Sequence, residues 1–329
     1  GPRLLPVPVD GERHPAEGLL QEGRQRELLQ ELDLLIIDEV SMLRSDMLDA
    51  IDTILRSVRK NHLFPFGGVQ VLFIGDLYQL PPVVPPEEWN LLKDYYESPF
   101  FFHAKVIEQS PPLYIELKKI YRQNEQHFID LLNRIRNNIV LPKDLQELNS
   151  RQLFLAQEHL VKDTITLTTH NRKADTINAA ELEKLPGKSY RFEGLIEKEF
   201  NENALPTELT LLLKEGAQVM FIRNDSGESR RFFNGKLATV SRIVKDEIYL
   251  IPVGEQAELK LEKETWKNIR YNYNKEKDSI EEEELGSFTQ YPVRLAWAIT
   301  IHKSQGLTFE KAIIDAGQAF APGQVYVAL

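Results

Sequence analysis

The stretch Leu34-Leu-Ile-Ile-Asp-Glu-Val-Ser-Met42 places four branched apolar residues directly before two adjacent carboxylates. A short apolar run of this kind predicts a parallel strand that is buried on both faces. Asp38 and Glu39 then fall at the carboxyl end of the strand, the edge at which open α/β sheets bind ligands. Nucleotide hydrolysis uses such a pair of acids. On these residues alone, a strand that simply ends in two solvated acids is an equally good interpretation.

The two acids would have different roles in nucleotide hydrolysis. One holds Mg²⁺, usually through water, because Mg²⁺ keeps part of its hydration shell. The other positions or deprotonates the attacking water. We assign Asp38 to the first role and Glu39 to the second, and we expect both to lie at the metal.

Length and composition set the class of protein. At 329 residues the chain suits two domains, or two domains and an insert. No apolar run approaches the roughly 18–20 residues that span a bilayer, and no signal-peptide pattern is present, so we expect an intracellular protein without a membrane partner. The chain has no cysteine and seven scattered histidines, which argues against disulfides, thiolate chemistry and a structural metal cluster.

The chain is acidic, with a formal net charge of −10 and a pI of about 5.4. This balance argues against nucleic-acid binding through bulk positive charge. It remains compatible with a local basic groove, because electrostatic steering depends on how the charge is distributed.

The residues after the acidic pair predict a βαβ unit. Apolar residues at helical spacing indicate an amphipathic helix over 43–60. A second apolar strand, Val69–Ile74, runs into Gly75-Asp-Leu-Tyr-Gln-Leu-Pro-Pro-Val83. Gln79 lies in a loop stiffened by two prolines, where its amide could sense a terminal phosphate. A loop glutamine without such neighbours is more often a solvated side chain.

A second α/β region follows a turn-rich stretch. We predict strands at Tyr114–Leu117 and Thr164–Thr168, and a helix over 172–184. Between the two strands, a helix carries Phe128, Leu131, Leu132 and Ile135 on one face, with Arg134 and Arg136 off that face.

Short β-rich runs then predict a small barrel inserted into the second domain. Asn234-Gly235 predicts a two-residue hairpin turn, and the acidic stretch Lys275–Glu284 a solvated hairpin tip. Beyond the insert, Arg294–Ser304 reads as a mostly apolar helix that Gly306 ends, and Lys311–Asp315 as a buried strand. The predicted runs of the insert are Ala217–Ile222, Lys236–Val244, Glu247–Ile251, Glu258–Glu262 and Thr265–Tyr273.

Five segments, taken in order, resemble the successive motifs of one family. The chain is similar to the PIF-type (petite integration frequency) DNA helicases, in the RecD-like branch of superfamily one, from about Leu32 to Leu329. The second and fifth segments are highly specific. The segments are Asp38-Glu-Val-Ser-Met42, Gly75-Asp-Leu-Tyr-Gln-Leu-Pro-Pro-Val83, Ile120-Tyr-Arg-Gln123, Leu167-Thr-Thr-His-Asn171 and Leu295-Ala-Trp-Ala-Ile-Thr-Ile-His-Lys-Ser-Gln-Gly-Leu-Thr-Phe309.

The resemblance implies an α/β fold of two RecA-like parallel-sheet domains, the first truncated, with a small SH3-like β-barrel inserted in the second. It implies a monomeric motor that uses ATP and Mg²⁺ to move 5′ to 3′ on single-stranded DNA and at DNA forks. The implied parts are a wedge-subdomain remnant (1–32), the partial first domain (33–112), the first part of the second domain (113–204), the insert (205–291) and the truncated second part (292–329).

The resemblance also implies roles for individual residues. Asp38 and Glu39 serve Mg²⁺ and the attacking water, Gln79 reads the γ-phosphate, and Gly306 contacts the nucleotide. Arg122 is the implied arginine finger, and a guanidinium can spread charge over phosphate oxygens in the transition state. Residues that contact DNA, or couple it to the nucleotide cleft, are His170, Asn171, His302, Lys303, Ser304, Gln305 and Thr308.

Two expected motifs are missing. Gly187-Lys188-Ser189 does not form a phosphate-binding loop, because Leu182 stands where the upstream glycine is needed. The resemblance places the real loop before Gly1 and a final Ser-Arg step after Leu329. We therefore expect an internal fragment with little ATPase activity of its own and an incomplete first sheet, whose uncovered edge is prone to association.

Two other readings stay open. The chain could be an ATPase-dead module that grips single-stranded DNA. It could also come from a RecD-like exonuclease subunit or a relaxase-linked helicase, which would share most of these motifs.

Overall fold

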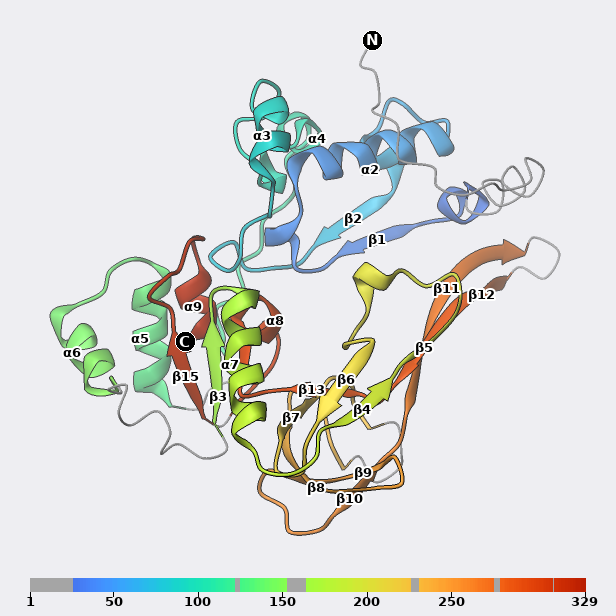
Figure 1. Ribbon diagram of the computed structural model, residues 1–329. Coiled ribbons are helices and arrows are strands. Elements are labelled where there is room, and N and C mark those ends of the chain that lie inside the picture. Colours follow the sequence, from blue (N-terminus) through green and yellow to red (C-terminus); the bar gives the residue numbers. More distant parts are fainter. Residues whose placement is uncertain (1–25, 122–124, 153–163, 226–230, 275–278, 310) are drawn as a thin grey trace.

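The computed structural model describes residues 26–121, 125–152, 164–225, 231–274, 279–309 and 311–329. These residues form two α/β lobes and a β-rich module that extends from the second lobe (Figure 1). Among the described helices, none has the length and apolar character needed to span a membrane.

The first lobe is built on a parallel pair of strands joined by a helix. Strand β1 (Leu34–Ile37) pairs in parallel with β2 (Gln70–Phe73), and α2 (Ser45–Val58) is the crossover between them. This arrangement confirms the predicted βαβ unit. The other described elements of the lobe are a helix over 26–30, η1 (Val40–Met42), η2 (Pro65–Gly68), α3 (Pro86–Leu92), η3 (Phe101–His103) and α4 (Lys105–Gln109).

Helix α2 carries the core of this lobe. Leu48 and Leu55 are almost completely buried, in one cluster with Val69, Phe101 and Val106. Each such side chain contributes about 1.5–3 kcal/mol of burial free energy. The helix thereby fixes the position of the strand that carries the acidic pair.

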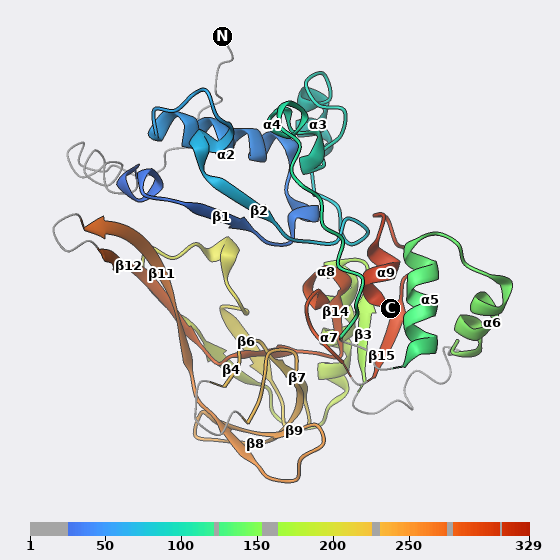
Figure 2. The same ribbon diagram turned by 180° about the vertical axis from the view of Figure 1, so that it is seen from behind.

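The prediction that β1 is buried on both faces is wrong. Leu35 and Ile37 pack into the α2 core, whereas Leu34 is 43% exposed, Ile36 55% and, on the neighbouring strand, Leu72 46%. The physical reason is visible in Figures 1 and 2. Helix α2 covers one face of the two strands, and no described helix covers the other.

The second lobe contains a three-stranded parallel sheet in the order β14-β3-β15. Its core joins Ile165 and Leu167 of β3 to Ile299 and Ile301. The strand at 164–168 and the two predicted helices are confirmed. A strand also forms within 311–315, but its predicted burial is wrong: β15 lies at the edge of the described sheet, and Ile314 is 36% exposed. The elements are α5 (Gln126–Arg136), α6 (Pro142–Ser150), β3 (Ile165–Thr168), α7 (Asn171–Lys184), β14 (Ala298–Thr300), α8 (Ile301–Ser304), β15 (Ala312–Asp315) and α9 (Gln324–Ala328).

Two predicted elements of this region are wrong. Tyr114–Leu117 is not a strand, because it has no partner strand among the described residues and its apolar side chains stay exposed. Arg294–Ser304 is not one helix: β13 (Val293–Leu295) and β14 precede the four-residue α8. A short apolar run fits a buried strand as well as a helix, and here pairing with β3 decides the outcome.

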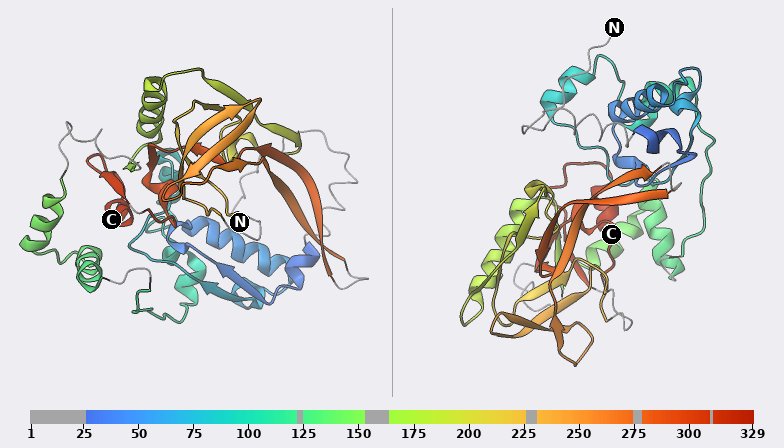
Figure 3. Two further views of the ribbon diagram at one scale, coloured as in Figure 1. Left: turned by 90° about the horizontal axis from the view of Figure 1, so that it is seen from below. Right: turned by 90° about the vertical axis from the view of Figure 1, so that its right-hand side faces the viewer.

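The β-rich module folds into three hydrogen-bonded sheets, in the orders β10-β9-β8-β7-β13, β11-β12-β5 and β4-β6. All five predicted runs contain a strand, and the first and third sheets share one buried core. The long β11–β12 hairpin projects beside the first lobe (Figure 3). The strands are β4 (Tyr190–Glu193), β5 (Leu195–Lys198), β6 (Thr210–Leu213), β7 (Gln218–Phe221), β8 (Leu237–Val244), β9 (Glu247–Pro252), β10 (Leu259–Leu261), β11 (Glu264–Asn274) and β12 (Ser279–Gln290), with η5 (Glu202–Ala204) after β5.

The prediction of a two-residue hairpin at Asn234-Gly235 is also wrong. These residues form a turn, but β7 ends at Phe221 and β8 begins at Leu237, so the connection is much longer. Only Gly235 has a positive φ, 95°, whereas a type I′ hairpin turn needs both central residues there.

The stability that the ion pair between Arg134 of α5 and Asp144 of α6 contributes should depend on pH. The carboxylate of Asp144 accepts two 2.7 Å hydrogen bonds from Arg134 and one from the N–H of Leu141. The bonds from Arg134 lower the pKa of Asp144 to about 2. Because the folded-state pKa lies below the ordinary value of 3.8, the stabilisation is complete above pH 3.8 and is lost as the pH falls towards 2.

The comparison of wild type with Asp144→Asn tests this pH dependence. The melting temperature of wild type should exceed that of the variant near pH 5, and the difference should shrink between pH 4 and pH 2. A difference that stays constant over this range would contradict the linkage.

Candidate functional site

The acidic pair sits on a tight turn at the carboxyl end of β1. Glu39 adopts a left-handed conformation (φ 51°, ψ 42°), which is uncommon for a residue other than glycine. Its N–H donates to Oδ1 of Asp38 at 2.8 Å, and both side chains are exposed. A Cβ on Gly75 would lie 2.9 Å from the backbone nitrogen of Val40, so the ends of β1 and β2 can approach only with glycine there. The predicted position of both acids at the strand end is confirmed.

The loop after β2 places Gln79 beside this turn. The carboxylate of Asp76 accepts the N–H of Tyr78 at 3.1 Å, and the carbonyl of Asp76 accepts the N–H of Gln79 at 3.0 Å. Leu80 is fully buried and anchors the far end of the loop. These contacts fix the backbone of Gln79 and leave its amide half-buried at the strand edge.

One side chain of the second lobe bridges the acids and this loop. Nε2 of Gln305, just after α8, donates to Oε2 of Glu39 at 3.0 Å and to Oε1 of Gln79 at 3.1 Å. Three residues selected from sequence thus meet across the two lobes. Two roles were expected for Gln305: contact with DNA, or coupling of DNA to the nucleotide cleft. Its position fits the second, because its amide contacts the predicted catalytic residues Glu39 and Gln79.

A pocket of about 400 Å³ opens next to this bridge. Gly306, with a φ of 76°, and Thr308 lie in its wall, as do Gln79 and Ile120. Arg122, the predicted arginine finger, lies outside the described residues, two positions after Ile120. Its role stays a prediction.

The predicted nucleic-acid residues separate into two groups. His170, Asn171 and Lys303 are exposed at the carboxyl edge of the second sheet, with His302 half-buried beside them. Burial lowers the pKa of His302 and so favours its neutral imidazole. The second group lines the pocket: Thr308, Gln305 and Ser304, whose buried hydroxyl donates to the carbonyl of Ile301 at 2.8 Å.

Sequence reasoning missed a second cross-lobe contact, centred on Asp76. Nη2 of Arg136, at the end of α5, lies 3.4 Å from Oδ1 of Asp76, and its guanidinium carbon lies 4.5 Å from the ring centroid of Tyr78. The hydroxyl of Tyr326 donates to Oδ2 of Asp76 at 3.4 Å, and burial raises the pKa of Tyr326, which keeps that donor neutral. The only sequence signal was the position of Arg136 off the apolar face of its helix.

Gly323 makes a third cross-lobe contact through its backbone. Its φ is 76°, and a Cβ built there would lie 2.2 Å from the carbonyl oxygen of Gln79 and 2.4 Å from that of Tyr78. A side chain at this position would therefore push the start of α9 away from the Gln79 loop.

The carboxylates fit Mg²⁺ better than a metal held entirely by protein ligands. Among the described residues, no group of three or more His, Cys, Asp or Glu side chains has the spacing of a metal cluster. Mg²⁺ is bound by one or two carboxylates together with water and phosphate oxygens. Exposed Asp38 and Glu39 match that donor set.

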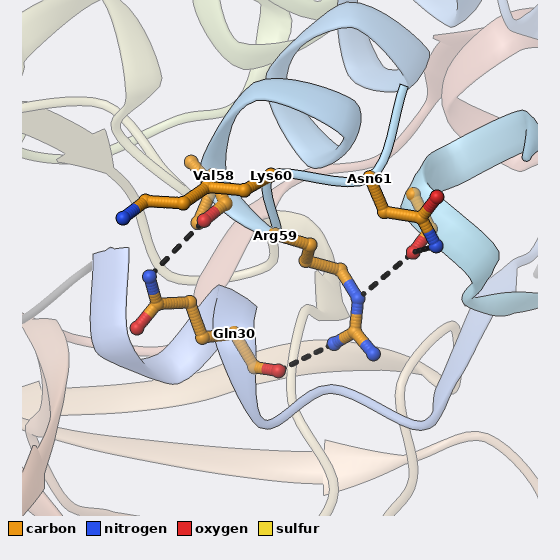
Figure 4. Close-up of a pocket in the computed structure, with 6 residues that line it drawn as sticks. Gln30, Val58, Arg59, Lys60 and Asn61 are labelled. Atoms are coloured by element: carbon orange, nitrogen blue, oxygen red, sulfur yellow. Dashed lines mark hydrogen bonds between the residues drawn. The ribbon is translucent and has the colours of Figure 1, made fainter. Parts of the chain in front are cut away.

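A second pocket, of about 320 Å³, has a structural origin (Figure 4). Nη1 of Arg59 donates to the carbonyl of Leu32 at 3.0 Å, and its Nε donates to the carbonyl of Gly67 at 3.2 Å. Nε2 of Gln30 donates to the carbonyl of Val58 at 3.0 Å. These bonds connect the helix over 26–30 to the end of α2. The guanidinium of Arg59 is therefore occupied by structural hydrogen bonds.

Comparison with known proteins gives a consistent result. A family model described as PIF1-like helicase matches residues 5–144. The chain is 35% identical over 309 residues to the ATP-dependent DNA helicase PIF1 of Homo sapiens, an alignment that covers 90% of this chain and 44% of that protein. The chain thus spans less than half the length of this relative.

Two solved structures of Bacteroides Pif1 give the same picture. The complex with ADP-AlF4 is 41% identical, with a TM-score of 0.83, over 93% of this chain and 69% of that one. The chain bound to single-stranded DNA is 39% identical, with a TM-score of 0.62, over 98% and 71%. This similarity confirms the predicted α/β class with RecA-like lobes.

Proposed function

The chain belongs to the PIF1-like helicase family, and from this premise we propose that it is the core of an ATP-dependent motor that moves 5′ to 3′ on single-stranded DNA. The observation that carries the proposal is the bridge from Gln305 to Glu39 and Gln79, because it joins the acids of one lobe to the predicted DNA-binding lobe. The Bacteroides relatives solved with ADP-AlF4 and with single-stranded DNA support both ligands.

The chemistry that we propose follows from the positions of the side chains. ATP binds between the lobes, and Asp38 holds Mg²⁺ through water. Mg²⁺, when bound, neutralises charge on the terminal phosphates. Glu39 orients the attacking water and accepts its proton, while the amide of Gln79 contacts the γ-phosphate. We further propose that Arg122, which lies outside the described residues, serves as the arginine finger that the family resemblance implies.

We propose that Gln305 couples hydrolysis to movement. Its amide donates to a catalytic acid and to the phosphate sensor, and it follows directly after Lys303 and Ser304 of α8. When Gln79 turns to a γ-phosphate, or Glu39 to a water, the donor on Gln305 must find another acceptor. That change shifts α8 and the exposed residues that precede Gln305, and so alters the grip on DNA.

The partners that we propose are single-stranded DNA and DNA forks, bound by a monomer. One similar solved structure is described as the structural basis for DNA unwinding at forked duplexes by two coordinating Pif1 helicases. His170, Asn171, His302 and Lys303 supply a polar edge for the strand. Such a local polar edge can bind DNA although the chain as a whole is acidic, because individual side chains contact individual phosphates of the strand.

The domain organisation stays a proposal with the expected boundaries. The first domain covers 33–112 and the second 113–204 and 292–329, with an SH3-like insert at 205–291. The described helix at 26–30 falls in the proposed wedge remnant (1–32), most of which lies outside the described residues.

A DNA-binding module without ATPase activity is the second candidate. It is favoured by one observation: the 329 residues contain no phosphate-binding loop, since Gly187-Lys188-Ser189 lies in the turn that leads into β4 and precedes no helix. We propose that the motor function needs that loop, and that these 329 residues alone bind DNA without appreciable turnover of ATP.

Binding and turnover assays on the 329-residue chain test this proposal. Fluorescence anisotropy with labelled oligo-dT should detect binding that weakens steeply from 50 to 200 mM salt. Lys303→Ala should lower the slope of log affinity against log salt by about 0.7, the value for one phosphate contact on a single strand. ATP turnover should stay at background with or without DNA. An absence of DNA binding would refute both candidates, and helicase-like turnover would refute the need for a separate loop.

A further inference from the structure

Phe320 is an aromatic side chain that the proposed chemistry does not use. It follows β15, in the loop that leads to α9, and it is 62% exposed. Its ring centroid lies 5.0 Å from that of His170 and 6.0 Å from that of His302, and the His302 ring is within 18° of parallel to it. Three flat rings thus gather at the edge of the second sheet where we place the DNA strand.

The backbone of Phe320 is held by a buried amide. Gln324 is completely buried, its Oε1 accepts the N–H of Phe320 at 3.1 Å, and its Nε2 donates to the carbonyl of Thr169 at 3.5 Å. The side chain of Gln324 therefore ties the Phe320 loop to the end of β3, where His170 follows. A fixed loop with a solvent-facing ring is preorganised for binding. Less conformational entropy of the loop and its side chains is lost when a ligand binds there.

Packing does not explain this ring. Phe221, by contrast, is fully buried and stacks on Phe232 with a centroid distance of 4.1 Å. Most of the Phe320 ring faces solvent, and its ring neighbours are two imidazoles. A single ring beside polar heterocycles is also unlike the broad apolar patch of a protein docking site.

We propose that Phe320, flanked by His170 and His302, is a stacking platform for one unpaired nucleobase. The inference rests on the proposed DNA-binding function and adds a base contact to it. Stacking tolerates any base, because every base has a π face. Exposed Lys303 lies next to His302 in the chain, where it can meet the phosphate of the same strand. The platform holds the base, and the cation holds the backbone.

A two-by-two binding experiment tests the platform. Wild type and Phe320→Ala are each titrated with a twelve-residue oligo-dT and with a twelve-unit abasic oligomer that keeps the phosphates. We expect Phe320→Ala to weaken binding to oligo-dT by about 5- to 100-fold, the range for loss of one stacked base. It should leave binding to the abasic oligomer unchanged. Phe320→Trp should keep or strengthen binding to oligo-dT, and Phe320→Leu should not rescue it.

The control variant and the possible outcomes distinguish failure of the stacking platform from failure of the proposed DNA-binding function. Phe64 is 59% exposed and precedes the amino end of β2, at the edge opposite the acidic pair, so Phe64→Ala should leave both affinities unchanged. Equal losses on both oligomers, or full rescue by leucine, would overturn the platform and leave the proposed function standing. If wild type binds neither oligomer, the proposed function fails and the platform fails with it.

Discussion

Glu39→Gln should lower the kcat of DNA-stimulated ATP hydrolysis by about 10²–10⁴-fold, the usual contribution of a positioned general base, in a competent helicase that contains this chain. The geometry makes this substitution a clean one. A glutamine at 39 keeps the side-chain length and an oxygen that can accept from Nε2 of Gln305, now at 3.0 Å from Oε2 of Glu39. The cross-lobe bridge survives while the proton acceptor is lost, so KM for ATP should change little.

The matched control for Glu39→Gln is Glu88→Gln. Glu88 is a first-lobe acid whose partner is Arg44, with Nη1 to Oε2 at 2.6 Å, and Arg44 keeps a second partner in Asp46. Removal of the Glu88 charge should leave kcat within a factor of about two, since surface ion pairs contribute little. Single-turnover measurement of phosphate release isolates the chemical step. A Glu39→Gln enzyme that releases phosphate at the wild-type rate would exclude Glu39 as the base.

The parts of the site that could be predicted from sequence are those set by local structure. Asp38 and Glu39 follow an apolar strand directly, and Gln79 follows the next strand, so βαβ geometry alone brings them to one edge. The same logic placed β3 and the helix after it. These elements depend on the pattern of apolar and polar residues within short stretches, and that pattern is visible in the sequence itself.

Contacts that depend on the packing of the lobes could not be predicted this way. Nothing near Arg136 in the sequence indicates that its partner is Asp76, sixty residues away. The two acceptors of Gln305 lie on the other lobe. The family resemblance implied that Gln305 contacts DNA or couples it to the nucleotide cleft, but it did not identify these two partners. The segment 294–304 was misread for a related reason: its apolar residues fit a helix until β3 and β7 are available as pairing partners.

Gly323 shows the same limit at a single residue. Ala321-Pro322-Gly323 reads as an ordinary turn, and a positive φ of 76° is all that a turn would require. The stronger constraint is tertiary, because the carbonyl oxygens of Tyr78 and Gln79 occupy the space that a side chain would need. A turn glycine and an interface glycine are indistinguishable until the other lobe is in place.

Gly323→Val should therefore separate the lobes at the Gln79 loop. The left-handed conformation by itself costs about 1–3 kcal/mol for such a residue, and a Cβ at 2.2 Å from the carbonyl oxygen of Gln79 cannot be accommodated without movement of the backbone. The bridge from Gln305 to Glu39 should be lost with that movement. In a competent helicase, ATP turnover should fall by about 10²-fold, the effect of a misplacement of about 1 Å.

The lobe separation can be measured directly, because the chain has no native cysteine and label pairs are unambiguous. Spin labels at Ser57→Cys on α2 and Ala180→Cys on α7, both exposed, should report a longer and broader distance distribution in Gly323→Val than in wild type.

Gly254→Val supplies the control for backbone strain, since Gly254 has a φ of 84° and open space around its Cβ position. Gly317→Val, in the same loop as Gly323 and also without close neighbours, supplies the control for an added side chain. If either control opens the lobes as far as Gly323→Val does, the effect is general destabilisation and the glycine contact does not set the cleft. If only Gly323→Val opens them, the close approach of α9 to the Gln79 loop is what holds the two halves of the site together.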